Sequence, residues 1–388
     1  MCNIISDYYK PEEVEIITPD DGAHYFFAYY DMRATGPNGK HLAHRVPFMD
    51  RIPNADDVAE VGYLEDKKFY KIGETTAWNF QQGAMLQYHP FLENTVYYNV
   101  FENGKFSTVT HNFITGEKKY TDRATACVSP DGKWGLAVNF GRIYDFRAGY
   151  GYAGFVDENS DVNHPENDGA YLVDMETGKS KLIINYKDLG SIAGFGPDLK
   201  ILINHITFNR TSDRFVMLVR NFNSPGVTWS TSMVIGDLEG NCYAVLKNTY
   251  FSHYDWINDK EIIAHCAVED KKGLYKINVD TKTYTLYDMP FCNNEERPHD
   301  IHCNMSPDGN YIIGDSYPTD GYRAIMAYSL KTGKERVLLK AKTLKPTTGD
   351  SRCDLHDRFV WGGKAITFDT THNDKREIAL ISPKALDF

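Results

Sequence analysis

Four short segments share one pattern and decide the fold: His205-Ile206-Thr207-Phe208, His253-Tyr254-Asp255-Trp256, His302-Cys303-Asn304-Met305 and His356-Asp357-Arg358-Phe359. Each begins with a histidine, has a large apolar residue three positions later, and is followed by a polar turn and an apolar strand. The histidines are 48, 49 and 54 residues apart. A period of about 40 to 55 residues, with several strands in each repeat, is typical of the blades of a β-propeller.

Earlier parts of the chain fit the same repeat without the histidine. The turn Ser129-Pro130-Asp131-Gly132 matches Ser306-Pro307-Asp308-Gly309, and each turn lies between two apolar runs. We therefore expect an all-β, seven-bladed propeller that forms a single domain over residues 1–388, with blades opening near residues 24, 84, 124, 204, 252, 301 and 355. The last blade supplies three strands, so residues 14–17 are expected to add its fourth strand and close the ring.

The composition limits the partners and the compartment. The 388 residues include 42 Lys+Arg and 53 Asp+Glu, a net charge of −11 that argues against binding of nucleic acid or an anionic membrane. No apolar stretch reaches the roughly 18 to 20 residues of a membrane span, and the amino terminus lacks the features of a secretory signal. The 7 cysteines include no C-x-x-C pair, which predicts reduced thiols. We expect a cytoplasmic protein, and the oligomeric state stays open.

The register of the repeat predicts where the histidines meet. In a propeller the first strand of each blade lines the central channel, and all first strands run in the same direction. We therefore expect His205, His253, His302 and His356 to converge at one mouth of the channel. Clustered imidazoles suit Zn, Mn, Fe or Ni. The structural alternative is that each histidine forms a hydrogen bond to the neighbouring blade.

Charged, amide and aromatic residues accompany the histidines. Arg352, Asp354 and His356 alternate along one predicted strand and so share a face. Arg220 ends the strand that follows His205. Amides can bond sugar hydroxyls, aromatic faces stack on sugars, and arginine pairs with carboxylates. On these grounds the candidate sugar-binding residues, most of them in the long segment 141–167, are Gln82, Gln87, Arg142, Arg147, Tyr150 and Tyr152.

The blade starts, the histidine series and residues 352–356 resemble the oligogalacturonate lyases and their relatives among propeller-shaped polysaccharide lyases. The resemblance implies a site at the channel mouth, a manganese ion held by histidines and a glutamine, and a histidine base beside an arginine. By position, His253 and His356 are similar to metal ligands, and His205 and Arg220 to the base and its cation. Asp354 stands where the family's Q-x-x-H-x-H run has another histidine, and Ser351 stands where it has the glutamine.

These observations lead to the hypothesis of a lyase that cleaves an acidic, uronate-containing oligosaccharide by β-elimination. His205 would remove the C5 proton, with Arg220 and Arg352 near the uronate carboxylate. A divalent ion would neutralise that carboxylate, and its candidate ligands are His253, His302, His356 and Asp354, with His302 included by register alone. Manganese is the ion that the resemblance implies; calcium, zinc or no metal are the alternatives.

Two other functions remain open from the sequence. A propeller fold hosts many activities, so the chain could be a non-catalytic carbohydrate-binding or scaffold protein. It could also be a glycoside hydrolase that removes a rhamnose cap from glucuronate. Such a hydrolase would release a saturated product, whereas a lyase would release an unsaturated uronate.

Overall fold

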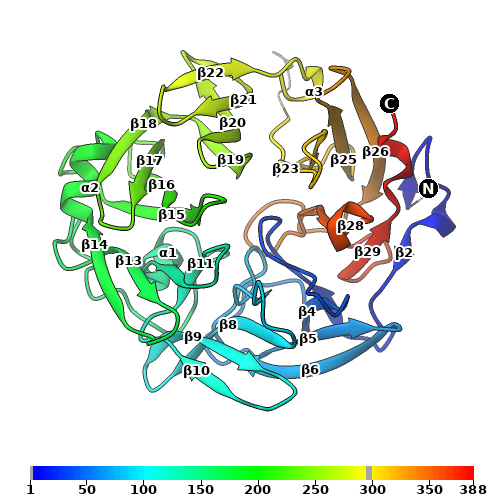
Figure 1. Ribbon diagram of the computed structural model, residues 1–388, viewed down its shortest axis with the longest axis horizontal. Helices are drawn as coiled ribbons and strands as arrows, with labels where there is room; N and C mark the ends of the chain where they lie inside the picture. Colours follow the sequence, from blue (N-terminus) through cyan, green and yellow to red (C-terminus); the bar gives the residue numbers. More distant parts are fainter. Residues whose placement is uncertain (1–2, 294–298) are drawn as a thin grey trace.

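The strands form a ring of seven antiparallel sheets around a central channel (Figure 1) in the computed structural model, which describes residues 3–293 and 299–388. In each sheet the strand at the start of the repeat lies nearest the axis, and later strands lie progressively further out. The predicted all-β, seven-bladed propeller is therefore confirmed.

Four sheets come from the first two thirds of the chain. From the inner to the outer strand they consist of β3 (His24–Phe26), β4 (His41–Val46), β5 (Ala59–Glu65) and β6 (Lys68–Thr75); β7 (Gln87–Tyr88), β8 (Thr95–Glu102), β9 (Lys105–Asn112) and β10 (Lys118–Tyr120); β11 (Thr125–Val128), β12 (Trp134–Ala137), β13 (Gly169–Asp174) and β14 (Ser180–Asn185); and β15 (Ile201–Phe208), β16 (Arg214–Asn221), β17 (Thr231–Asp237) and β18 (Cys242–Thr249).

The other three sheets complete the ring. They consist of β19 (Phe251–Trp256), β20 (Glu261–Val268), β21 (Lys271–Asn278) and β22 (Thr283–Leu286); β23 (Asn304–Met305), β24 (Tyr311–Asp315), β25 (Tyr322–Ser329), β26 (Glu335–Lys342) and β1 (Ile4–Ile5); and β27 (Arg358–Val360), β28 (Ala365–Thr370), β29 (Glu377–Ile381) and β2 (Glu15–Ile16). The described helices are α1 (Phe140–Phe146), α2 (Tyr186–Ala193) and α3 (Pro290–Asn293), with 3-10 turns at Pro11–Glu13, Trp361–Gly363 and Pro383–Leu386.

The amino-terminal segment closes the ring. Strand β2 pairs with β29, with Glu15 opposite Leu380 and Ile16 opposite Ala379, so the last blade obtains its fourth strand where residues 14–17 were predicted to supply it. Strand β1 adds a fifth strand to the preceding sheet, where Ile4 lies opposite Ala341. Both pairings cover sheet edges that would otherwise be open.

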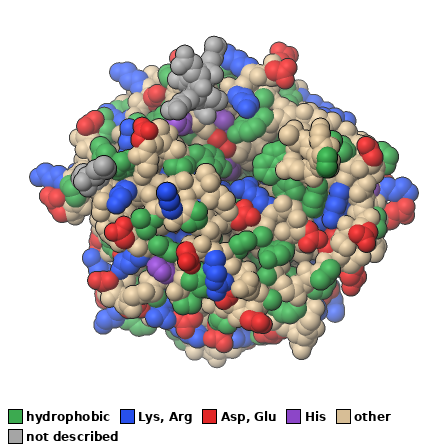
Figure 2. Space-filling model, turned by 180° about the vertical axis from the view of Figure 1, so that it is seen from behind, with side chains coloured by type: hydrophobic (Ala, Val, Ile, Leu, Met, Phe, Trp, Pro, Cys, Tyr) green, Lys and Arg blue, Asp and Glu red, His purple; other side chains and the backbone are tan. Residues whose placement is uncertain are grey.

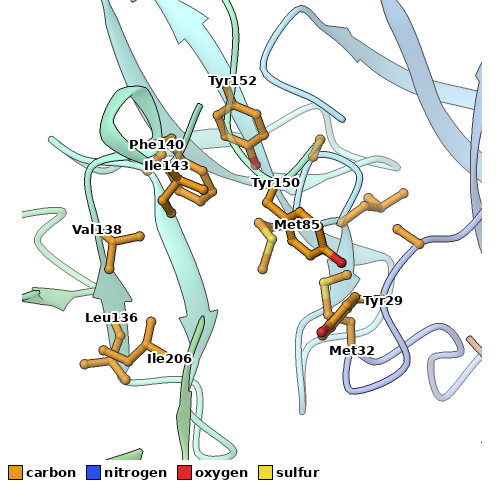
Figure 3. Close-up of a cluster of buried hydrophobic side chains, with 14 of the residues drawn as sticks. Tyr29, Met32, Met85, Leu136, Val138, Phe140, Ile143, Tyr150, Tyr152 and Ile206 are labelled. Atoms are coloured by element: carbon orange, nitrogen blue, oxygen red, sulfur yellow. The ribbon is translucent and has the colours of Figure 1, made fainter. Parts of the chain in front are cut away.

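The core lies between neighbouring sheets. The central strands of the blades are apolar on both faces because each sheet is covered on both sides, and β16 is buried along nearly its whole length. One cluster packs Val216 and Leu218 of β16 against Phe251 and Tyr254 of β19. Figure 3 shows part of a larger cluster, in which Leu136, Val138 and Ile206 lie to one side of the aromatic rings of Tyr29 and Tyr150.

Residues 27–33, between β3 and β4, enter the channel. The backbone N–H groups of Phe27 and Ala28 donate to the Asp369 carboxylate at 3.0–3.2 Å, and Arg358 donates to the Ala28 carbonyl at 2.9 Å. Tyr29 lines a pocket on one side of this segment, whereas Tyr30 lines a pocket on the other side. Residues 27–33, called the channel segment below, therefore separate the two mouths of the channel.

Two smaller expectations can be compared with the structure. The described cysteines, residues 127, 242, 266, 292, 303 and 353, are all free thiols, and Cys2 lies outside the described residues. None of the described helices combines the length and the apolar character needed to cross a bilayer.

Candidate functional site

The four repeat histidines converge at the axis of the ring, as the register predicted. The ring centroids of His253 and His302 are 3.9 Å apart, and those of His302 and His356 are 4.4 Å apart. Tyr29 connects the fourth imidazole to the group, because its ring centroid lies 4.9 Å from His205 and 5.0 Å from His356. All four histidines are buried.

Local irregularities of the inner strands direct these side chains. The pairing register of β15 shifts between Ile203 and His205, and that of β19 shifts between Phe251 and Tyr254. A bulge of this kind re-aims the side chains beside it. His356 precedes its inner strand and has a φ of 44°, in the left-handed region that non-glycine residues rarely adopt. The repeat therefore places the backbone, and deviations from regular pairing orient the imidazoles.

Asp315 fixes the orientation of His302. The two side chains are joined between Nδ1 and Oδ1 at 2.5 Å, and the other carboxylate oxygen accepts the backbone N–H groups of Leu355 and His356 at 2.7 and 3.0 Å. Burial acts to lower the pKa of His302, but the charge and hydrogen bond of Asp315, together with the charges of Asp354 and Asp300, outweigh burial and raise that pKa. A carboxylate behind a histidine is the usual support of a metal ligand, because it fixes the ring and leaves Nε2 as a more basic donor.

His302, Asp354 and His356 fit a divalent metal ion. Their ligand atoms lie within 4.8 Å of one another, and all three residues are buried. Within the described part of the chain, Nε2 of His302 and Nε2 of His356 are buried without a hydrogen-bond partner. Asp354 is paired with Arg323 at 2.7 Å and with Arg352 at 2.6 Å. The imidazole nitrogens are therefore the strongest donors of the group. Imidazole suits Zn, Cu, Fe or Ni, and a carboxylate such as that of Asp354 suits Mn.

His253 stands beside this group but has its own carboxylate. Its Nδ1 lies 2.9 Å from Asp300, and the second carboxylate oxygen accepts the Ser252 hydroxyl at 2.5 Å. Burial lowers the pKa of His253 to about 4, although the Asp300 charge opposes this shift. The imidazole is therefore neutral near pH 7, with Nδ1–H donated to Asp300 and Nε2 available as a proton acceptor.

A pocket of about 610 Å³ opens beside His253. Figure 2 shows one face of the molecule hollowed at its centre, with histidine, basic and acidic side chains around the hollow. The cations and aromatic residues that line the pocket are Arg147, Arg220, Lys272, Tyr29, Tyr150, Trp229, Tyr250 and Tyr317. Such a lining suits an acidic sugar, since the rings can stack on its faces and the cations can pair with its carboxylate.

Two of the predicted arginines are held at one end of this pocket. Arg220 donates to the Thr231 hydroxyl at 3.0 Å and to the Phe251 carbonyl at 3.1 Å, and its guanidinium lies 5.0 Å from the centre of the Trp229 ring. Arg147 lies 4.4 Å from the centre of the Tyr150 ring. Trp229 itself is 41% exposed, and the Arg147 guanidinium lies 5.7 Å from the centre of its ring, so both cations lie near this partly exposed ring.

Both ring nitrogens of His205 are engaged. Its Nδ1 lies 3.2 Å from Nε2 of Gln82, and its Nε2 lies 2.9 Å from the Asp31 carboxylate. An amide nitrogen only donates, so Nδ1 accepts that bond and Nε2–H donates to Asp31. His205 lines the pocket, but neither nitrogen is free to accept a proton. Gln82 lies behind His205 rather than in the lining.

Besides Gln82, three predicted sugar-binding residues lie away from this pocket. Arg142 of α1 is fully buried and pairs with Asp157 at 3.0 Å, so its charge is satisfied internally. The Tyr152 hydroxyl is buried and accepts a hydrogen bond from Asn99 at 3.0 Å. Gln87 lines a smaller pocket, together with Asp31, on the other side of the channel segment.

Several residues at the site carried no signal in the repeat. Asp300 and Asp315, which orient two of the histidines, do not recur from blade to blade. Tyr29 comes from the channel segment, and Arg323 lies in the middle of a buried region where its charge pairs with Asp354. Only the position of Asp300, just before the opening of a blade, could have indicated its role.

Comparisons with known proteins identify solved structures that share this fold. No protein-family model matches the chain, and no curated protein matches it. Solved structures do: an oligogalacturonate lyase in complex with manganese has a TM-score of 0.65 at 14% identity, over 98% of this chain and 96% of that one. The oligogalacturonate lyase from Vibrio parahaemolyticus gives 0.64 at 14% identity, with the same coverage of 98% and 96%.

A propeller with a different role is also similar. The β-propeller domain of the Trilobed protease from Pyrococcus furiosus has a TM-score of 0.53 at 10% identity, over 93% of this chain and 96% of that one. Identities this low establish a shared fold and leave the chemistry to be argued from the site. The chain is thus a seven-bladed propeller whose architecture resembles that of the oligogalacturonate lyases over nearly its whole length.

Proposed function

We propose that the protein is a lyase that cleaves a uronate-containing oligosaccharide by β-elimination. The observation that carries this proposal is His253, a neutral imidazole oriented by Asp300 at the edge of a pocket that also contains three cations. A base and an adjacent positive field are what removal of a proton next to a carboxylate requires. The aromatic lining supplies stacking faces for the sugar rings.

The chemistry assigns a role to each end of the pocket. Positive charge on the uronate carboxylate makes the C5 proton more acidic, because it stabilises the enolate-like charge of the transition state. Arg220 and Arg147 would bind that carboxylate, and Nε2 of His253 would accept the C5 proton. Asp300 would then stabilise the imidazolium that forms, through the Nδ1–H bond at 2.9 Å. The base and the residues that bind the carboxylate are therefore different side chains of the same pocket.

The base in this proposal differs from the one expected from the sequence. His205 is engaged by Gln82 and Asp31, so we assign it a positioning role: it holds Asp31 and packs against Tyr29. His302 and His356, with Asp354 beside them, would hold a divalent metal ion. When bound, such an ion supplies further positive charge for the substrate carboxylate.

The test is to look for an unsaturated uronate. The purified protein is incubated with galacturonate, glucuronate–rhamnose and ulvan-type oligosaccharides, each with Mn²⁺, Ca²⁺ or Zn²⁺, and the ultraviolet absorbance of the new C4=C5 bond is followed. Product masses are measured in parallel, because elimination adds no water. Saturated products that have gained water would identify a hydrolase, and binding without turnover would identify a carbohydrate-binding propeller; either result overturns the proposal.

A further inference from the structure

Tyr150 occupies a fixed position in the wall of the pocket. It lies between two glycines in the segment after α1, and a Cβ on Gly151 would lie 2.1 Å from the backbone nitrogen of Tyr144. A Cβ on Gly149 would lie 2.6 Å from the side chain of Asp350. Only glycine fits at these two places, so the turn is pressed against its neighbours. Tyr150 is 3% exposed and lines the pocket next to Tyr29 (Figure 3).

The hydroxyl of Tyr150 is held by a cation. Nη2 of Arg352 lies 3.2 Å from the phenolic oxygen. The guanidinium is itself fixed by Asp354 at 3.1 Å through Nε and by the Gly349 carbonyl at 3.0 Å through Nη1. A guanidinium has no acceptor, so the phenolic oxygen accepts this bond and its own hydrogen is free to donate elsewhere.

One proton transfer of the proposed elimination has no residue assigned to it so far. His253 removes the C5 proton, but the C4 oxygen departs as an alkoxide, a strong base that needs a proton as it leaves. We propose that Tyr150 is the general acid that donates this proton, an inference that rests on the proposed function. A phenol that lines the pocket and is backed by a guanidinium is suited to this step, because the positive charge stabilises the phenolate that remains.

The other tyrosines of the pocket fit this role less well. Tyr29 packs among the histidine rings. The centroid of the Tyr317 ring lies 6.2 Å from the centroid of the His302 ring. Within the described residues, no hydrogen bond joins a guanidinium to the hydroxyl of Tyr29, Tyr317 or Tyr250. Tyr150 is therefore the pocket tyrosine whose phenolate would have a cation in direct contact.

The step balances as a single elimination. The C5 proton moves to Nε2 of His253, and the electron pair of the C5–H bond forms the C4=C5 double bond. The C4–O4 bond breaks with its electron pair on O4, which takes the phenolic proton of Tyr150. The enzyme is left with an imidazolium and a phenolate, and exchange with water returns the proton from the one to the other.

The test measures the effect of Tyr150→Phe on two substrates that differ in their leaving group. One substrate is an acidic oligosaccharide that the wild-type protein cleaves, and the other is a uronate that carries 4-nitrophenoxide at C4, which departs without protonation. We expect kcat of the variant to fall by about 10²- to 10⁴-fold on the oligosaccharide. On the nitrophenyl substrate we expect a loss of less than about tenfold, since the acid is not needed there. An equal loss on both substrates, or no loss on either, overturns the assignment.

Two further variants keep the result interpretable. Tyr120→Phe removes a hydroxyl from β10, where the residue is 44% exposed, and should leave both rates unchanged. Arg352→Lys keeps a positive charge but loses the bond to Tyr150, and should reproduce the selective loss if Tyr150→Phe does not fold. If the wild-type protein forms no unsaturated product from either substrate, the lyase proposal itself fails. If it does and the variants show no selectivity, only the assignment of Tyr150 fails.

Discussion

Replacing His253 with alanine and, in a second variant, His205 with alanine separates a base from a positioning residue. The two substitutions are matched, because each removes the same side chain and each breaks a bond of 2.9 Å between an imidazole and a carboxylate. The two histidines are also similarly buried, at 5% and 6% exposure. Differences in activity between the variants therefore report on chemistry rather than on packing.

The structure sets different magnitudes for the two effects. A hydrogen bond to a charged group contributes about 1.5–3 kcal/mol, so both variants should lose stability by about this amount. A general base contributes about 10²- to 10⁴-fold to the rate, so His253→Ala should lower kcat at least about 100-fold. His205→Ala should keep kcat within about tenfold of the wild-type value, since neither of its nitrogens is free.

The assay follows the unsaturated product at saturating substrate and, in parallel, denaturant unfolding of each variant. Added imidazole provides a second readout, because it can enter the space left by His253 and restore part of the rate only if a base is missing there. The reasoning is refuted if His205→Ala loses the larger part of kcat, or if His253→Ala retains it while folded.

Three more predictions concern binding, metal and pH. Trp229→Ala should raise KM roughly two- to tenfold with little change in kcat, because a stacking face worth about 0.5–1.5 kcal/mol is lost; an unchanged KM argues against a sugar there. Elemental analysis after loading with Mn²⁺ should find the ion in the wild-type protein and not in the double variant His302→Ala, His356→Ala; equal retention contradicts the candidate metal group. Burial lowers the pKa of His41 to about 3 and of His44 to about 4, from 6.5. The unfolded chain therefore binds more protons below pH 6.5, and unfolding free energy should fall by about 1.4 kcal/mol per pH unit for each histidine down to pH 4; a flat profile in denaturant titrations contradicts this.

The architecture could be predicted because it repeats. The spacing of the histidines and the Ser-Pro-Asp-Gly turns indicated seven blades, and the missing fourth strand of the last blade indicated closure by residues 14–17. These signals are periodic, so each blade supports the reading of the others. The convergence of four imidazoles followed from the same register.

The roles of individual residues could not be read in this way, because they depend on partners that do not repeat. His205 and His253 look alike in sequence, yet Gln82 and Asp31 occupy both nitrogens of the first, whereas Asp300 leaves one nitrogen of the second available. Arg142 was expected to contact sugar because arginine pairs with carboxylates and this one lies in the long segment 141–167. Its guanidinium instead pairs with Asp157, 15 residues further along, and both side chains are fully buried.

The channel segment explains why a nearly symmetric ring produces an asymmetric site. Ala28 has a φ of 106°, a conformation that costs of order 1–3 kcal/mol in a non-glycine residue and persists only where its surroundings impose it. Asp369 and Arg358 of the last blade hold its backbone on both sides. The next residue, Tyr29, packs against His205 and His356, and no other blade contributes a segment of this kind to the described site. The ring therefore brings the imidazoles together, whereas single carboxylates make them differ: Asp31 of this segment binds Nε2 of His205, and Asp300, outside the segment, leaves Nε2 of His253 available.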